Sequence, residues 1–397
     1  MSYSSQGEKP PIAPVASGGR SPAGRALDTA LEFEPFWTWP AAALVFLTVV
    51  FPGISWAVWP AALALPLPLA LRWVRLGYPS VRTPFDVPIG LLLLGGIMGA
   101  LVSDSSVSLG ALLTLFALAA VFYSMVNYAR PRGLMVVLVA ATLVGVAAYG
   151  VSALFWGGPR TPASVQHLKD LLPFISALPE LPQPQDQVYP WTDFVHGFAL
   201  VLAVADAILI GVAVGRGRRR LRLASGTVAA VLTSVALLVT WGSLRSLMTG
   251  ASIVGRYEEH WLPALKYVLG HPSAGWTGMG LGTVASQPFF GHINSAYLEL
   301  WLNTGVMGVA ATVIAGVATA KLAVRIVRSP RTGRWHGLGL GLVGACLVTA
   351  LVGVAESSPF AIYLRTKETY LWMASPLPWI LAASLVVVSK PTSSSSD

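Results

Sequence analysis

Two arginines and a histidine lie close together in a polar stretch of an otherwise apolar sequence: Arg245, Arg256 and His292. Arginine carries a permanent charge and a planar fork of N–H donors, which suits it to hold phosphate groups. Histidine titrates near neutral pH and can accept or donate a proton during a reaction. This combination predicts an anion-binding site with a proton acceptor beside it.

Residues 255–272 have the pattern of an amphipathic helix around the second of these arginines. Apolar side chains, including Trp261, recur at helical spacing, Pro263 predicts a kink, and Gly270 and Pro272 end the segment. The opposite face carries the polar residues Arg256, Glu259, His260 and Lys266. We predict a helix lying at a membrane surface with its aromatic side down.

Two interpretations of this helix stay open. It could simply dock on the rest of the protein, or its polar face could bind an anion, because Arg256 and His260 stand one turn apart.

A glycine-rich turn and a helix start follow. Gly275, Gly278, Gly280 and Gly282 allow the backbone to approach a ligand or a neighbouring helix closely. Residues 291–295, with His292 and Asn294, then open a long apolar helix. The positive end of that helix dipole is expected to keep the His292 imidazole neutral.

The elements that must position these residues span a membrane. Of the 397 residues 54% are hydrophobic and only 11% are charged, and the mean hydropathy is +0.66. A soluble domain has about 25% charged residues. The composition therefore excludes a soluble domain, a disordered protein and a disulfide-rich module. It also excludes a nucleic-acid-binding protein, because the basic residues fall in short clusters between apolar runs.

The fold class predicted is an all-α, polytopic membrane helix bundle with about ten transmembrane helices and a periplasmic loop subdomain. A spanning helix needs about 20 apolar residues. Ten runs qualify, at about 36–51, 54–71, 87–103, 107–128, 133–155, 194–215, 223–241, 296–320, 337–355 and 371–389. Residues 1–35 are predicted to be a disordered cytosolic arm, 36–389 the transmembrane domain, and 390–397 a cytosolic tail.

The distribution of basic residues predicts the orientation. With the N-terminus inside, 19 of the 26 Lys and Arg residues fall in cytosolic segments and 7 on the opposite side. Both termini are then cytosolic. Two long segments, about 157–193 and 242–295, lie outside, and the second contains most of the polar residues of that face.

At this point the residues resemble a known family. The stretch VGRYEEHWLPALKYVLGHPSAGWTGMGLGTV and the following GHINSAYLELWLNTGVMG are similar to the signature region of the O-antigen ligase and polymerase superfamily. The preceding WGSLRS resembles that family's Ser-Arg element. The resemblance covers about residues 235–310. This chain departs from the family where Asn303 stands in place of a frequent acid, with Glu299 one turn earlier, and where only ten residues separate Arg245 from Arg256.

The resemblance implies a membrane glycosyltransferase of the bacterial inner membrane, with its active site facing the periplasm. Such an enzyme transfers a glycan from an undecaprenyl diphosphate carrier to a hydroxyl of an acceptor sugar, on another glycan or on a lipid A core. Arg245 and Arg256 would clamp the diphosphate, and His292 would act as the general base, with inversion at the anomeric carbon. His260, Lys266, Trp261, Asn294 and His196 are expected to contact the substrate.

We expect no metal and no cofactor, because the sequence lacks an Asp-x-Asp motif and arginines can neutralise the leaving diphosphate. The main alternative is a secondary transporter or lipid flippase, and a membrane scaffold is the third interpretation. Asp206 and Glu299 lie within predicted spans, where acids are costly and often functional. Their roles stay open, as do the choice between ligase and polymerase and the identity of the sugar.

Overall fold

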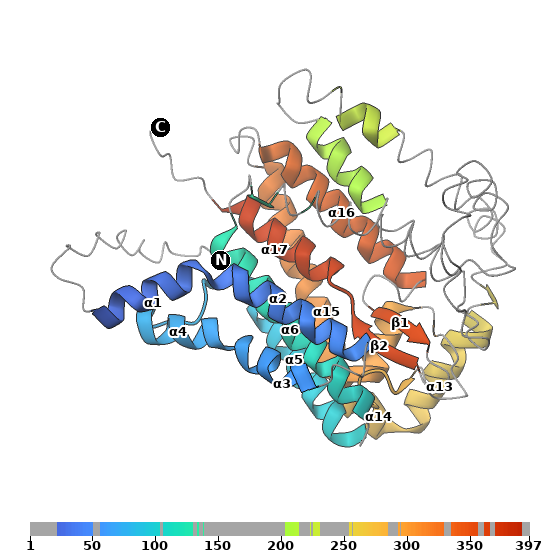
Figure 1. Cartoon of the computed structure of the whole chain (residues 1–397). Helices are drawn as coiled ribbons and strands as arrows, with labels where there is room; N and C mark the ends of the chain where they lie inside the picture. Colours follow the sequence, from blue (N-terminus) through green and yellow to red (C-terminus); the bar gives the residue numbers. More distant parts are fainter. Residues whose placement is uncertain are drawn as a thin grey trace, which may run out of the picture.

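A computed structural model of the chain describes the following residues: 22–50, 56–103, 106–129, 133–134, 138, 203–213, 223, 225–230, 254–255, 257–284, 293, 295–328, 335–355, 361–365 and 370–390. Most of them are helical (Figure 1). Within these described ranges, four helices are long and apolar enough to cross a membrane: α5 (Asp86–Ser103), α6 (Ser106–Tyr128), α15 (Ala296–Arg328) and α16 (His336–Ala355).

The chain is therefore a mostly helical protein with the character of a membrane protein. Three predicted spans, at about 133–155, 194–215 and 223–241, fall largely outside the described residues. A helix at Ala203–Ala213 lies within the second of them. The total of ten spans and the cytosolic placement of both termini stay predictions.

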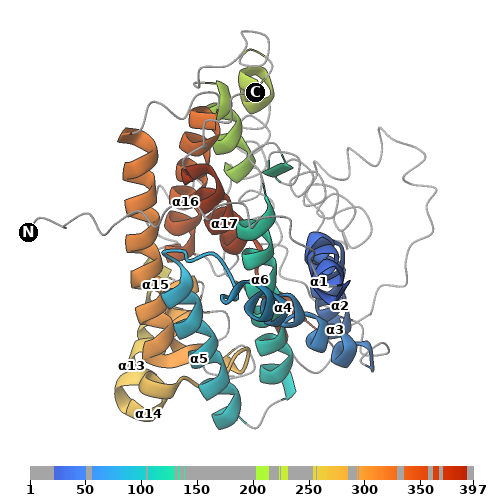
Figure 2. The ribbon, with the colours of Figure 1, turned by 90° about the vertical axis from the view of Figure 1, so that its left-hand side faces the viewer.

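The long helices pack side by side around a common core (Figures 1 and 2). α15 contacts α5 and α16, while α6 contacts α2 (Glu34–Val50), α5 and α17 (Leu377–Ser389). Phe122 and Leu118 of α6, Leu342 of α16 and Leu385 of α17 are fully buried in this core. Apolar side chains between the helices stabilise the bundle by dispersion and close packing, which is the main attraction left in a lipid environment.

Large apolar side chains also cover the outside of the bundle. On α15 and α16 the exposed ones include Val306, Val313, Val317, Val324, Leu347 and Leu351. A soluble protein rarely leaves such continuous apolar surface in water. These faces are suited to contact lipid.

The bundle has two chemically different ends. At one end, which we call the platform end, Ser108 near the start of α6 donates a hydrogen bond to the Leu281 carbonyl over 2.9 Å. At the other, the basic end, the Lys390 ammonium donates to the Val126 carbonyl in the last turn of α6 over 2.7 Å. The described basic residues gather at the basic end: Arg25, Arg72, Arg75, Arg82, Lys321, Arg325, Arg328 and Lys390. Among side chains that the structure describes, Lys266 is the only Lys or Arg at the platform end.

The disordered arm predicted for residues 1–35 is wrong for residues 22–35. Helix α1 (Pro22–Glu32) precedes α2 and contacts α4 (Leu67–Leu76) at the basic end. The Arg75 guanidinium donates two hydrogen bonds to Asp28, over 2.7 and 3.1 Å, and the Asp28 carboxylate raises the pKa of that guanidinium. Arg75, the partner of Asp28, lies 47 residues further along the chain, so local composition does not predict this contact. Residues 1–21 lie outside the described part of the chain.

The predicted second span is divided. Helix α3 (Val58–Ala64) and α4 are separated at Leu65 and Pro66, and Pro66 is the N-cap of α4. The exposed side chains of this pair, Leu63, Leu67 and Val74, follow helical spacing along one outer face. The interruption at Pro66 thus divides the predicted span into two short helices, and exposed apolar side chains continue across it.

A two-stranded hairpin replaces the start of the predicted last span. β1 (Ala361–Arg365) pairs antiparallel with β2 (Tyr370–Ala374), and α17 begins only at Leu377. The prediction of a helix from residue 371 is therefore wrong for its first six residues. Pro376 caps α17, and the N–H of Ala374 donates to the Thr114 hydroxyl of α6 over 3.1 Å, so the strand is anchored to the bundle.

Candidate functional site

The described part of the polar segment forms a compact unit at the platform end of the bundle. A π-helical turn, η2 (Tyr257–Trp261), leads into α13 (Leu262–Gly270), and α14 (Pro272–Thr277) follows. We call residues 257–284 the platform. Pro263 lies in the first turn of α13, where its missing N–H costs no helical hydrogen bond, and the irregular turn precedes it.

The platform is docked on the bundle through a small apolar cluster. Ala264 and Val268 of α13 are buried, with 1% and 6% of their surface exposed, and they pack with Val284, Ile293 and Leu302 of the chain beyond. Partly buried aromatic and aliphatic side chains surround the cluster: Trp261, Tyr267, Met279, Leu298 and Trp301. Helix α13 is thus docked on the bundle, while an anion site on its polar face and its place relative to a membrane surface stay predictions.

The glycine turn is held by helices on several sides. Gly278, Gly280 and Gly282 adopt positive φ angles of 80°, 99° and 77°, which other residues rarely adopt. The Met279 N–H donates to the carbonyl of Leu302 on α15 over 2.6 Å, and the Leu281 carbonyl accepts from Ser108 on α6. The glycines therefore permit close approach of backbone to neighbouring helices, which was one of the two roles predicted for them.

Helix α15 is broken where the platform meets it. Gly305 has φ 65° and ψ −156°, outside the helical region. The break divides α15 into a short part before Gly305, which we call the upper part, and a long part after it. The Trp276 carbonyl oxygen of α14 lies where a Cβ on Gly305 would be. The Trp301 indole N–H also donates to the Gly275 carbonyl over 3.1 Å. The platform backbone therefore fills the break.

Buried polar side chains line the upper part of α15. Ser295, Glu299, Asn303 and Thr304 have 5%, 2%, 1% and 0% of their surface exposed. The Oδ1 of Asn303 accepts a hydrogen bond from the Gly282 N–H over 3.1 Å, and its Nδ2 donates to Glu299 Oε1 over 3.5 Å. The sequence did not identify Asn303 as part of the site. Its signals in the sequence are its position one turn after an acid within an apolar run and its place where the resembled family often has an acid.

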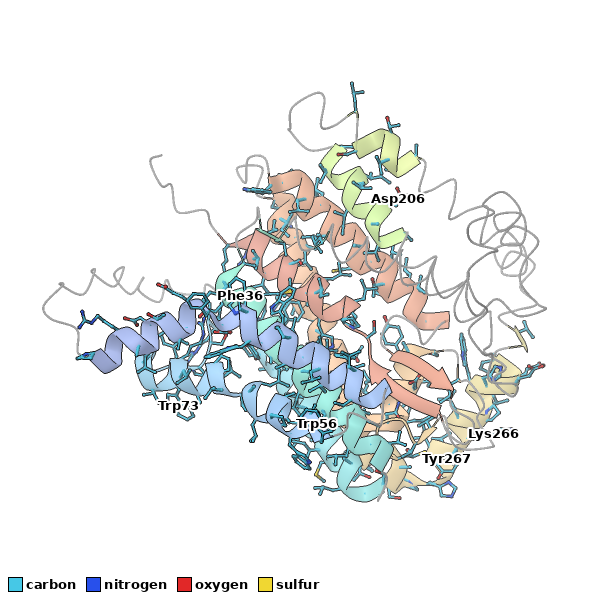
Figure 3. The ribbon with its side chains drawn as sticks, in the orientation of Figure 1. Phe36, Trp56, Trp73, Asp206, Lys266 and Tyr267 are labelled. Carbon is cyan, nitrogen blue, oxygen red and sulfur yellow. The ribbon has the colours of Figure 1, made fainter. Side chains whose placement is uncertain are left out.

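Three of the predicted substrate-binding residues lie on the platform. Trp261 is partly buried beside the apolar cluster, His260 precedes it in η2 and is also partly buried, and Lys266 is exposed on α13 (Figure 3). Next to Lys266, the Tyr267 ring stacks on the His271 ring with centroids 4.2 Å apart. The carbonyl of Tyr267 lies 3.1 Å from His271 Nδ1, so that nitrogen is the donor.

The other predicted site residues lie outside the described residues: Arg245, Arg256, His292, Asn294 and His196. Tyr257, the residue after Arg256, begins η2. Ile293, the residue after His292, is 3% exposed in the cluster with Ala264 and Val268.

The two intramembrane acids do not share a site. Asp206 is buried on the helix Ala203–Ala213, which packs closely on α16 through Gly211 and Gly341. That helix lies far from α13 and α14 in both views (Figures 1 and 2). Glu299 belongs to the platform end. Within the described ranges no three His, Cys, Asp or Glu side chains are grouped as metal ligands, and metal independence stays a prediction.

Comparisons with known proteins identify no relative of this chain. No protein-family model, no curated protein and no solved structure matches the chain. The resemblance over residues 235–310 therefore depends on the motif residues themselves.

Proposed function

We propose that the chain is a membrane glycosyltransferase that moves a glycan from an undecaprenyl diphosphate carrier to an acceptor sugar hydroxyl at the platform end. The observation that carries the proposal is the platform itself, a packed polar unit at the end of the bundle opposite the basic residues. Since Lys and Arg mark the cytosolic side, the platform end is the external one, which is the periplasmic face of a bacterial inner membrane.

The platform would bring the proposed catalytic residues to one place. Arg256 immediately precedes η2, and His292 immediately precedes Ile293, which packs on α13. Ile293 and Trp261, four residues after Tyr257, belong to the same apolar cluster. A reaction that needs an anion clamp and a base within a few ångströms requires such a fixed scaffold.

Each residue has a distinct task in the proposed reaction. Arg256 and Arg245 hold the diphosphate by charge-assisted hydrogen bonds and stabilise the charge that develops as it leaves. His292 removes the proton of the acceptor hydroxyl, whose oxygen attacks the anomeric carbon in line and inverts it. Lys266, exposed on α13, adds positive potential on the side from which the donor approaches.

One observation favours the alternative of a secondary transporter or lipid flippase. Transporters bind their substrates at broken helices, and α15 is broken at Gly305. Here, however, the Trp276 carbonyl and the Gly278 backbone occupy the break. The platform backbone thus packs against the break, which supports the transferase over a substrate site at the break.

The test is transfer by the purified full-length protein in lipid nanodiscs. Carrier-linked repeat units are supplied with and without a lipid A core acceptor. A ladder of longer carrier-linked glycans indicates a polymerase, and glycan on the core indicates a ligase. No product with either acceptor, together with flipping of a fluorescent carrier lipid in vesicles, would support the alternative instead.

A further inference from the structure

Two buried polar side chains connect the upper part of α15 to the glycine turn. Glu299 and Asn303 are four residues apart and therefore share a helix face. Asn303 uses both ends of its amide: its oxygen accepts from the Gly282 N–H over 3.1 Å, and its nitrogen donates to Glu299 over 3.5 Å.

The chemistry of the two neighbours determines how the Asn303 amide is turned. A backbone N–H only donates, so Gly282 requires the amide oxygen. The amide nitrogen then faces Glu299 Oε1, which accepts its hydrogen bond. In the opposite orientation the amide N–H groups would face the Gly282 N–H. Glu299 thus stabilises the orientation in which Asn303 can hold the turn.

The turn depends on such contacts because its own residues do not restrict it. Glycine reaches positive φ as readily as negative φ, so Gly278, Gly280 and Gly282 alone allow many conformations. The Met279 and Leu281 backbone bonds hold the first part of the turn. The Asn303 bond holds Gly282, from which the chain continues toward His292.

We propose that Glu299 is a positioning residue of the transfer site, which acts through Asn303 to hold the glycine turn that precedes His292 in the sequence. This inference rests on the proposed function. Glu299 does not touch the reacting atoms. Its loss should slow the chemical step without weakening donor binding, because a displacement of about 1 Å can cost up to about 100-fold in rate.

An exchange of the two side-chain chemistries tests the proposal. In Asn303→Asp two carboxyl groups face each other, and the amide donor to Glu299 is lost. In the double variant Glu299→Gln with Asn303→Asp, the new amide donates to the new carboxylate, whose second oxygen still accepts from Gly282. Glu258→Gln, an exposed acid of η2, is the matched control.

Two readouts are followed: the kcat and donor KM of transfer, and hydrogen–deuterium exchange of the peptide containing residues 278–284. For Asn303→Asp we expect kcat to fall about tenfold or more, donor KM to stay within about threefold, and exchange to rise. The double variant should recover most of the loss in kcat and most of the protection from exchange, and the Glu258→Gln control should stay within about threefold of wild type.

A double variant as slow and as exchangeable as Asn303→Asp overturns the proposal, as does an Asn303→Asp protein with wild-type kcat. If Asn303→Asp does not fold, recovery of folded protein in the double variant supports the pairing, and failure to recover it contradicts the pairing. If the wild-type protein shows no transfer at all, the proposed function fails. The exchange measurement then still decides whether Glu299 and Asn303 hold the turn.

Discussion

The carbonyl oxygen of Asn303 on α15 lies 2.7 Å from the position that a Cβ atom on Gly99 of α5 would occupy. The backbones of α5 and α15 therefore touch directly at the platform end, beside the glycine turn. Small residues permit this approach in membrane helices, where close packing and hydrogen bonds replace the hydrophobic effect between helices.

Gly99→Ala should destabilise the protein by about 1–3 kcal/mol, because backbone atoms must move to admit the methyl group. Gly90→Ala in the same helix is the control, since nothing lies within 4 Å of its added Cβ. That substitution should be neutral or slightly stabilising, because alanine favours helix over glycine. Thermal unfolding in detergent measures both, and equal midpoints for the two variants would contradict the contact.

A buried ion pair should stabilise the basic end. Arg72 Nε lies 2.9 Å from Glu34 Oε2, their side chains are 7% and 2% exposed, and the guanidinium stacks on the Tyr128 ring at 4.5 Å. Arg72→Met leaves the Glu34 carboxylate buried without this partner and should cost about 3–5 kcal/mol.

The double variant Arg72→Met with Glu34→Gln should recover part of that loss in the same unfolding measurement. Arg75→Met is the control, because Arg75 and Asp28 are each about a third exposed and water screens their attraction. If Arg75→Met lowers the stability as much as Arg72→Met does, burial of the Arg72–Glu34 pair adds nothing to its stabilising effect.

The orientation can be tested with single introduced cysteines after Cys346, the one cysteine of the sequence, is replaced by alanine. Ser273 on α14 and Val81 before α5 are exposed at the platform and basic ends, respectively. In intact spheroplasts an impermeant thiol reagent should label a cysteine at 273 and not one at 81, because only the platform end faces outward. The reverse pattern would invert the proposed topology.

Transfer should continue in the presence of EDTA. The expectation depends on arginines, rather than a divalent cation, neutralising the leaving diphosphate. The rate is measured with EDTA and again after adding Mg²⁺ or Mn²⁺. Loss of product in EDTA and its return with either ion would assign the charge stabilisation to a metal.

The long apolar runs were the most predictable part of the fold. The predicted runs 87–103, 107–128 and 337–355 match α5, α6 and α16 within one or two residues at each end. An uninterrupted apolar stretch of this length in lipid must satisfy its backbone hydrogen bonds internally, so a helix is nearly the only solution.

The contacts that shape the candidate site were not predictable in this way. The break at Gly305 depends on the α14 backbone, and the Asn303 bond depends on a turn 21 residues earlier in the chain. The residues of β2 are apolar and resemble the start of a membrane span. They form a strand by pairing with β1. Each of these features depends on contacts with residues that are distant in the sequence, and local hydrophobic periodicity does not predict such contacts.

The central claim is tested most directly by the initial rate of glycan transfer from a carrier-linked donor, measured for wild type, His292→Ala and Arg256→Ala alongside donor binding. The proposed function predicts transfer by wild type and a loss of about 10²–10⁴-fold in His292→Ala with donor binding nearly intact. Arg256→Ala should lose both rate and donor affinity, because a charge clamp acts in the ground state and the transition state alike. A folded His292→Ala protein that transfers glycan at the wild-type rate would contradict the role of His292, and a folded wild-type protein without transfer would contradict the function itself.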